Sequence, residues 1–311
     1  MRPIIIDTDP GQDDAFAILL ALASPELDLR AITVVAGNVP LHHTSRNART
    51  ICELAGRRDV EIYAGCDRPL MRPLVTAEEV HGKTGLDGYD LPLPTMALQD
   101  RHAVDFLVDT LRSGPDDGMT LCPVGPLTNI ALALMRAPDI KHKIREIVLM
   151  GGAYFEGGNV TPAAEFNIYV DPEAADLVFR SGLPITVMPL DVTHKALTTR
   201  ERVEAFRRLP NRVGPVAAAW LDFFERFDVE KYGSAGAPLH DPCTIAYLLR
   251  PELFKAKQVN LCVETRSDLT LGQTVVDWWR VTNRPANVQF VTEIDAEGFF
   301  ALLTERLATL P

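Results

Sequence analysis

The chain has 311 residues, of which 47% are apolar and 23% are charged, a composition typical of a globular protein. Lys and Arg total 31 against 42 Asp and Glu, and this net charge of −11 argues against a general nucleic-acid binder and against adhesion to anionic lipid, because both need a basic surface. A chain of this length buries roughly 75% of its unfolded surface, so it needs no disulfides to build a core.

Short β-branched segments alternate with helical patterns along the chain. The patterns predict strands at 2–7, 29–36, 119–124, 146–150 and 185–189 and, between them, helices at 13–23, 47–55, 127–135 and 173–180. This β-α-β alternation predicts an α/β fold with an open, mostly parallel (mixed) sheet, helices on both faces and a Rossmann-like arrangement. In such sheets, ligands bind beyond the carboxyl ends of the strands.

Two regions depart from this alternation. Residues 66–97 contain prolines and no clear periodicity, and a loop of this length is usually functional or disordered. Residues 200–232 are helical and rich in aromatic side chains. Late strands and a last helix are predicted near 258–264, 273–279, 289–292 and 296–307. Because no linker, repeat or low-complexity tract interrupts the chain, we expect a single domain over residues 1–311.

The cysteines and the N-terminus indicate the compartment. Five cysteines, an odd number with no C-x-x-C spacing, predict reduced thiols rather than a disulfide framework or a zinc site. No segment approaches the ~20 apolar residues of a membrane span, and the N-terminal MRPIIIDTDPG reaches acidic residues before the apolar core of a signal peptide could form. We therefore expect a cytoplasmic protein with neither a membrane nor a nucleic-acid partner.

The N-terminal segment DTDPGQDDA places Asp7, Asp9, Asp13 and Asp14 within eight residues. Asp7 and Asp9 end the first strand two residues apart, so we expect them on the same side, with Asp13 and Asp14 opening the next helix. Two like charges about 4 Å apart repel by about 4 kcal/mol at an effective dielectric constant near 20, more than the ~0.3–1 kcal/mol that an acid gains at a helix N-terminus. The cluster therefore predicts a hard divalent cation, Ca²⁺ or Mg²⁺. The alternative is that these acids only cap the turn and the helix.

A further acid lies in GAPLHDPCTIAYLL. Asp241 precedes a proline, the pattern of a helix N-cap followed by the first helical residue. Asp171 has the same pattern, and we interpret it as a cap alone. Asp241 differs because His240 stands beside it and because a glycine-rich approach lets the chain come close to a ligand, so a role in a site competes with the cap interpretation.

Polar side chains also follow the strand that ends at Met150. Two glycines permit close backbone approach there, and Asn159, Glu165 and Asn167 then supply amide and carboxylate groups. Such groups suit several hydroxyls of one small ligand, such as a sugar, and turn formation is the alternative. The alternation in EFN predicts Glu165 and Asn167 on one side and Phe166 on the other.

Together these segments resemble the nucleoside hydrolase family. The family's N-terminal signature, D-x-D-P-G-x-D-D, matches DTDPGQDD, and VVAGNV, VGPLTNIA, LMGGAY, AEFN and HDP are similar to family segments in the same order over nearly the whole chain. The resemblance implies a hydrolase that cleaves the N-ribosidic bond of a nucleoside substrate into free base and ribose, as in nucleoside salvage.

The resemblance also implies residue roles. It implies as ligands of a bound Ca²⁺ the side chains of Asp9, Asp14 and Asp241 and the backbone carbonyl of Val124. It implies as ribose-site residues Asp13, Asn38, Met150, Asn159, Glu165 and Asn167. The Ca²⁺ would also take up ribose hydroxyls and hold the attacking water, and Asp9 is the implied general base.

The departing base needs a proton donor, and a His that titrates near neutral pH suits that task. His240 is the first candidate, and His81 in the long loop is the second, with a solvated loop residue as the alternative interpretation of His81. We interpret as structural the remaining histidines, His42, His43, His102, His142 and His194.

Substrate preference rests on weaker similarities. The segments GAPLHDPCTIAYLL, CVET and TVVDWW are more similar to the bacterial members that prefer pyrimidine nucleosides, uridine and cytidine, than to the purine-specific members. Phe223, Phe227 and Tyr232 have a helical spacing that suits stacking on the nucleobase and packing in the core or in a lid equally. The family resemblance further implies a homo-oligomer, a tetramer or a dimer.

Two other functions compete with this interpretation. Phosphatases of the haloacid dehalogenase type also place D-x-D after an apolar strand and use one Asp as a nucleophile with Mg²⁺, but here Pro10 and Gly11 follow the motif directly. A Ca²⁺-dependent sugar-binding module without catalysis would use the same polar residues.

Overall fold

The computed structural model describes residues 1–311 apart from positions 116 and 234, and it describes the backbone but not the side chains of residues 227–232. Its strands are β1 (Arg2–Thr8), β2 (Leu27–Val34), β3 (Ile62–Ala64), β4 (Met119–Pro123), β5 (Ile144–Met150), β6 (Ile185–Met188), β7 (Phe254–Val263), β8 (Thr274–Asp277) and β9 (Val288–Ile294). Over the described residues they form one sheet in the order β3-β2-β1-β4-β5-β6-β9-β7-β8.

Most of this sheet is parallel. Strands β1 to β6 and β9 pair in parallel with their neighbours, whereas β7 runs antiparallel between β9 and β8. The predicted mixed, mostly parallel α/β sheet is therefore confirmed. The chain builds outward from β1 through β2 and β3 on one side and from β4 through β5 and β6 on the other, so the strand order reverses between β1 and β4, the point where open α/β sheets bind ligands.

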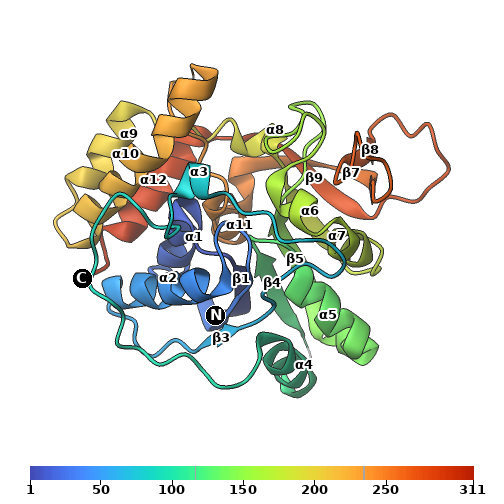
Figure 1. The fold of residues 1–311 in the computed structure, drawn as a ribbon, viewed down its shortest axis with the longest axis horizontal. Helices are drawn as coiled ribbons and strands as arrows, with labels where there is room; N and C mark the ends of the chain where they lie inside the picture. Colours follow the sequence, from blue (N-terminus) through green and yellow to red (C-terminus); the bar gives the residue numbers. More distant parts are fainter. Residues whose placement is uncertain (116, 234) are drawn as a thin grey trace.

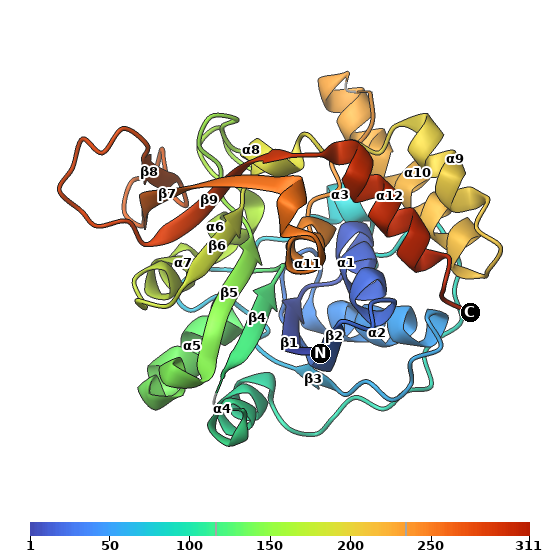
Figure 2. The ribbon, with the colours of Figure 1, turned by 180° about the vertical axis from the view of Figure 1, so that it is seen from behind.

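Helices cover both faces of the sheet (Figures 1 and 2). They are α1 (Gln12–Leu22), α2 (Leu41–Leu54), α3 (Glu78–His81), α4 (Ala103–Ser113), α5 (Thr128–Arg136), α6 (Phe166–Val170), α7 (Pro172–Phe179), α8 (Leu190–Thr193), α9 (Arg200–Arg207), α10 (Val213–Tyr232), α11 (Pro242–Leu249) and α12 (Ala296–Leu307), with 3-10 turns at Pro138–Lys143 and Pro251–Leu253. No helix in the described part of the chain combines the length and the apolar character needed to cross a membrane.

The position of β1 in the middle of the sheet explains its continuous run of apolar residues. In β1, Ile4 and Ile6 belong to the core shared with α1, α2, α10, α11 and α12, whereas Ile5 belongs to the core shared with α4, α5 and α7. Successive side chains of a strand point to opposite faces, and both faces are covered here. All three isoleucines are consequently fully buried.

Three local predictions need correction. Strand β3 and helix α4 lie in segments where no element was predicted, and α2 begins at Leu41, ahead of the predicted start at 47. The alternation predicted around Phe166 is wrong, because Glu165 is the N-cap of helix α6 and a helix does not follow a period of two. The long segment 66–97 contains only the single turn of α3.

Candidate active site

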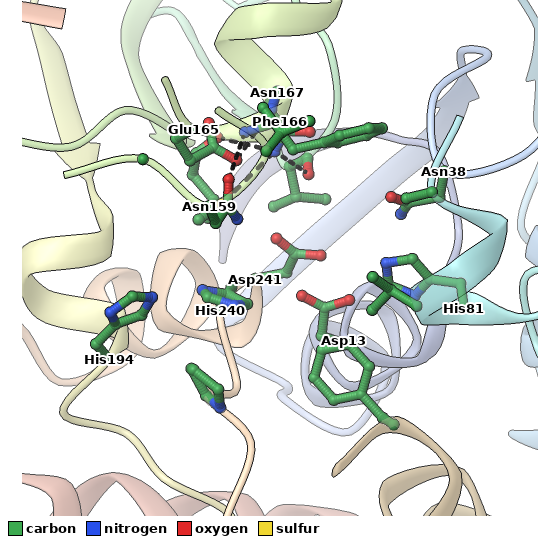
Figure 3. A pocket seen from close by; sticks show the side chains of 18 of the residues that line it. Asp13, Asn38, His81, Asn159, Glu165, Phe166, Asn167, His194, His240 and Asp241 are labelled. Atoms are coloured by element: carbon green, nitrogen blue, oxygen red, sulfur yellow. Dashed lines mark hydrogen bonds between the residues drawn. The ribbon is translucent and has the colours of Figure 1, made fainter. Parts of the chain in front are cut away.

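A cavity of about 540 Å³ lies beyond the carboxyl ends of β1, β4 and β5, at the reversal of strand order. Figure 3 shows its side chains. The structure brings to its wall the predicted residues Asp13, Asn38, His81, Val124, Met150, Asn159, Glu165, Asn167, His240 and Asp241. The predicted ligands Asp9 and Asp14 are not among the lining residues and are fully buried beside them.

Four carboxylates meet at the floor of this cavity. One oxygen atom from each of Asp13, Asp14 and Asp241 lies within 4.8 Å of the others, and Asp9 interacts electrostatically with all three. Burial and the neighbouring negative charges raise the pKa of Asp13 to about 8 and hold the pKa values of Asp9 and Asp241 well above the usual range for a carboxyl group. Such a group is costly to ionise without a counter-charge.

The hydrogen bonds of this cluster leave several of its carboxylate oxygens unpaired. Asp14 accepts hydrogen bonds from Thr8 and from the backbone N–H of Gly11, at 2.5 and 2.9 Å. In contrast, one buried oxygen of Asp9, of Asp13 and of Asp241 has no hydrogen-bond partner. Unpaired buried carboxylate oxygens are unfavourable, and three at one place fit the oxygen donor set of a hard cation.

Two glycines make room for the Asp9 carboxylate. A Cβ atom at Gly37 would overlap Asp9 Oδ2, and a Cβ atom at Gly125 would overlap Asp9 Oδ1. Both lie in loops that follow strands, β2 and β4, so the backbone can close around the carboxylate from two sides. The chain thus fixes Asp9 by close approach as well as by hydrogen bonding.

Asp7 does not join this cluster, and the expectation that it would is wrong. Its Oδ1 accepts hydrogen bonds from Thr33 at 2.5 Å and from Asn129 at 2.8 Å. Burial raises the pKa of Asp7 to about 7, with no contribution from another carboxylate. Strand β1 ends at Thr8, so the two-residue period that should align Asp7 with Asp9 does not extend to Asp9.

The two Asp-Pro helix starts have different roles. The Asp171 side chain caps α7 by accepting from the N–H of Ala174, as predicted, but it is not a cap alone, because it also accepts from the Thr128 hydroxyl and from the N–H of Leu70. Asp241 occupies the N-cap position of α11 without a side-chain capping bond. Its carboxylate faces the cavity instead (Figure 3).

The opposite wall of the cavity carries hydrogen-bonding groups. Glu165 accepts from the backbone N–H groups of Gly152 and Asn167, both at 2.9 Å, and burial raises its pKa to about 7. Asn167 Nδ2 donates to the carbonyls of Val124 and Met150 at 3.0 and 3.2 Å. Phe166 lines the same cavity, contrary to the predicted opposite orientation.

Two predicted histidines and one that we had interpreted as structural line the cavity. His240 Nδ1 lies 2.7 Å from the Thr193 hydroxyl, and burial lowers its pKa well below the usual value. The buried ring of His81 lies across the cavity, and burial lowers its pKa to about 3. His194 also lines the cavity, with its ring 5.9 Å from that of His240, a position that the sequence did not predict.

Among the described side chains of α10, the aromatic residue on the wall is Phe224, which lies next to the predicted Phe223. The Phe224 ring stacks on His81 at 5.5 Å, whereas the Phe223 ring lies under the guanidinium of Arg226. The side chains of Phe227 and Tyr232 lie outside the described residues. Neighbouring residues of a helix point about 100° apart, so only one of Phe223 and Phe224 can face the cavity fully. The spacing of aromatic residues does not show which of the two it is.

Comparisons with known proteins agree with this geometry. The chain is 53% identical to an uncharacterized protein of Schizosaccharomyces pombe and 51% identical to the pyrimidine-specific ribonucleoside hydrolase RihA of Photobacterium profundum, in each case over 99% of both chains. The structure is similar to a purine-preferring ribonucleoside hydrolase of Gardnerella vaginalis, with a TM-score of 0.92 and 35% identity over 99% of this chain and 98% of that chain.

Residues 4–301 match the family described as inosine-uridine preferring nucleoside hydrolase, which decides against the phosphatase and the non-catalytic sugar-binding alternatives. The chain belongs to this family and is a hydrolase of N-glycosidic bonds in ribonucleosides.

Proposed function

We propose that this protein is a Ca²⁺-dependent ribonucleoside hydrolase that prefers pyrimidine nucleosides, uridine and cytidine. The observation that carries the proposal is one cavity with a carboxylate cluster on its floor and hydrogen-bonding groups on the facing wall. The base preference is supported by relatives at about 51% identity over nearly the full chain that are named pyrimidine-specific.

The metal site consists, in this proposal, of Asp9, Asp14, Asp241 and the carbonyl of Val124. The unpaired buried oxygens of Asp9 and Asp241 support it, and Asp13 contributes a further unpaired oxygen beside them. A donor set of carboxylate and carbonyl oxygens favours Ca²⁺ over a softer metal. When bound, the ion would neutralise the cluster and lower the pKa of a water molecule.

Asp13, Asn38, Asn159, Glu165 and Asn167 hold the ribose in this proposal. They line the cavity together with Met150, and each carries an oxygen or nitrogen atom that can bond a hydroxyl. Asn38 is tied to the cluster, since its Nδ2 donates to Asp14 at 3.1 Å. The sugar would therefore lie with one face toward the carboxylates.

Cleavage of an N-ribosidic bond develops positive charge on the sugar, as in O-glycoside hydrolysis. Carboxylates fixed beneath the ring stabilise that charge because they need no reorganisation as it forms. Asp9 removes the proton of the attacking water as general base. In this proposal His240 protonates the departing base. The Thr193 hydroxyl lies 2.7 Å from Nδ1, and when it donates to Nδ1 the proton of the neutral ring is on Nε2, from which it can be donated.

An initial-rate panel tests this function. The substrates are uridine, cytidine, inosine, adenosine and the 2′-deoxy forms, with release of reducing sugar as the readout. We expect kcat/KM to be highest for uridine and cytidine and to fall without the 2′-hydroxyl. Higher values for inosine or adenosine would contradict the pyrimidine preference, and p-nitrophenyl phosphate serves as the negative control.

We also propose that copies of the chain associate, as a tetramer or a dimer. The segment after the edge strand β8 projects from the sheet, at the right of Figure 1, and carries Trp279 and Val281 at 76% and 84% exposure. We propose that these two side chains contribute to the association surface. Sedimentation equilibrium of the wild type and of Trp279→Ser tests it, because a monomeric wild type would contradict the proposal.

The cytoplasm is the compartment that we propose. All five cysteines are free; burial raises the pKa of the Cys52 and Cys122 thiols to about 12 and raises that of the Cys243 thiol well above its usual value. Free thiols persist in a reducing compartment. Cell fractionation of the native host tests this assignment, and recovery in a secreted fraction would contradict it.

A further inference from the structure

The hydrogen bonds of Gln12 fix which nitrogen of His81 carries the proton. Gln12 Nε2 lies 3.0 Å from the backbone carbonyl oxygen of His81 and 3.0 Å from that of Asp87. Carbonyl oxygens only accept hydrogen bonds, so the atom that both contact must be the amide nitrogen, and its two hydrogens are both used. The orientation of the Gln12 amide therefore follows from its partners.

The other end of this amide contacts the His81 ring. Gln12 Oε1 lies 2.7 Å from His81 Nδ1, and an amide oxygen can only accept, so Nδ1 carries a hydrogen. Gln12 is fully buried, and His81 is only 7% exposed, so water does not compete for this bond. A neutral His81 with its proton on Nδ1 has a bare lone pair on Nε2.

Neighbouring residues hold Gln12 and the His81 ring in hydrogen-bond contact. A Cβ atom at Gly11 would overlap His81 Nδ1, so the ring reaches Gln12 only because position 11 has no side chain. Asn47 Nδ2 donates to the carbonyls of Pro10 and Thr84, which ties the turn before α1 to the loop after α3. Phe224 stacks on the ring from α10.

We propose that Gln12 is a positioning residue that holds His81 in the Nδ1-protonated form, so that Nε2 accepts a hydrogen bond from the substrate. This inference rests on the proposed function, because His81 and the substrate share one cavity. It changes the role predicted for His81 from a donor of the leaving-group proton to an acceptor, and it leaves His240 as the donor. The partner of Nε2 is an O–H or N–H group, either the ribose 5′-hydroxyl or the N3–H of uracil.

A spectroscopic experiment tests the tautomer without turnover. In the ¹⁵N-histidine-labelled protein, long-range ¹H–¹⁵N correlation spectra distinguish a protonated from an unprotonated ring nitrogen, and a His81→Gln variant assigns the signals of His81. We expect a protonated Nδ1 and an unprotonated Nε2 in the wild type. A protonated Nε2 overturns the proposal, whether or not the protein hydrolyses uridine. Because the spectra do not depend on turnover, they still test the tautomer if uridine is not hydrolysed.

Two variants of Gln12 test the cause. Gln12→Met removes the acceptor at similar size, and we expect His81 to move toward the Nε2-protonated form with kcat/KM for uridine about 10-fold lower, the size of one hydrogen bond. Gln12→Glu keeps an acceptor for Nδ1 and loses the donor to the carbonyls of His81 and Asp87, so we expect a protonated Nδ1 in a less stable protein. An unchanged tautomer in Gln12→Met overturns the role of Gln12.

Substrate analogues identify the donor. If the ribose supplies it, the loss caused by Gln12→Met disappears with 5′-deoxyuridine, and if the base supplies it, the loss disappears with 3-methyluridine. An equal loss with uridine and both analogues overturns the acceptor role of His81.

Discussion

The backbone N–H of Asn38 donates a hydrogen bond of 2.7 Å to Asp9 Oδ2, while the other carboxylate oxygen, Oδ1, is buried without a partner. The same carboxylate is thus held firmly on one side and left open on the other. An unpaired buried acceptor costs about 1–3 kcal/mol. Asp7 also has one unpaired oxygen, Oδ2, but no other carboxylate acts on Asp7, whereas the unpaired oxygen of Asp9 belongs to a cluster with those of Asp13 and Asp241. The open side is where a cation and a water molecule would meet the carboxylate.

Substitution Asp9→Asn should therefore nearly abolish hydrolysis. The amide keeps the shape of the side chain but can neither take a proton nor carry negative charge, so we expect kcat for uridine to fall by about 10²–10⁴-fold. Reducing-sugar release measures the loss, and circular dichroism checks that the fold persists.

Asp7→Asn is the matched control for Asp9→Asn. Asp7 is equally buried and lies two positions away, but its hydrogen-bond partners are Thr33 and Asn129. We expect this variant to lower the melting temperature and to leave turnover near that of the wild type. Full activity of Asp9→Asn would refute the assigned base.

Removal of the metal should make stability depend strongly on pH. The folded metal-free protein keeps protons on Asp7, Asp13 and Glu165 up to about pH 7, 8 and 7, whereas Asp and Glu in an unfolded chain titrate near pH 4. Between about pH 4 and pH 8 these three groups bind more protons in the folded state than in the unfolded chain, so their contribution to stability falls as the pH rises through this window. The lowered pKa values of His81 and His240 act in the opposite direction below about pH 6.5.

Bound Ca²⁺ should oppose that fall, because it stabilises the folded state and replaces protons in the carboxylate cluster. We expect the difference in melting temperature between excess Ca²⁺ and chelator to be larger at pH 8 than at pH 5, measured by scanning calorimetry. Asp241→Asn should reduce the difference, and Mg²⁺ in place of Ca²⁺ tests the identity of the ion. Equal melting temperatures with Ca²⁺ and with chelator would remove the metal from the proposal.

His240→Ala should lower turnover more than substrate affinity. If His240 donates to the departing base, its contribution arises in the transition state, so we expect kcat to fall by about 10²–10⁴-fold with little change in KM. Thr193→Val keeps the ring and removes only its 2.7 Å hydrogen-bond partner, so we expect a loss of about 2–10-fold. A raised KM at normal kcat would instead make His240 a binding residue.

The sequence predicted the residues of the site better than their orientation. Asp13, Asn38, Glu165 and Asp241 all reach the cavity because each follows a strand or opens a helix at one edge of a parallel sheet, and that edge follows from β-α-β alternation. Whether a side chain points into the cavity or toward another residue of the fold depends on the residue at which its strand or helix ends. Asp7 was misassigned for that reason.

Other parts of the site depend on contacts between distant segments. Gln12 and His81 are 69 positions apart, and their hydrogen bond exists only because the loop after α3 folds back over the start of α1. His194 reaches the wall through the short helix α8, which has no periodic pattern long enough to recognise. Local sequence patterns carry no information about such pairings.

Phe224 should determine how tightly the nucleobase binds. Its ring lines the cavity and stacks on His81 with an interplanar angle of 28°, so a flat ligand can extend the aromatic contact. We expect Phe224→Ala to raise KM for uridine by about 5–10-fold, equivalent to about 1 kcal/mol of stacking, and to leave kcat less affected. Phe223→Ala is the control on the same helix, because Phe223 is not among the lining residues of the cavity and its ring contacts Arg226. Equal increases of KM in both variants would show that helix α10 acts through packing and not through contact with the base.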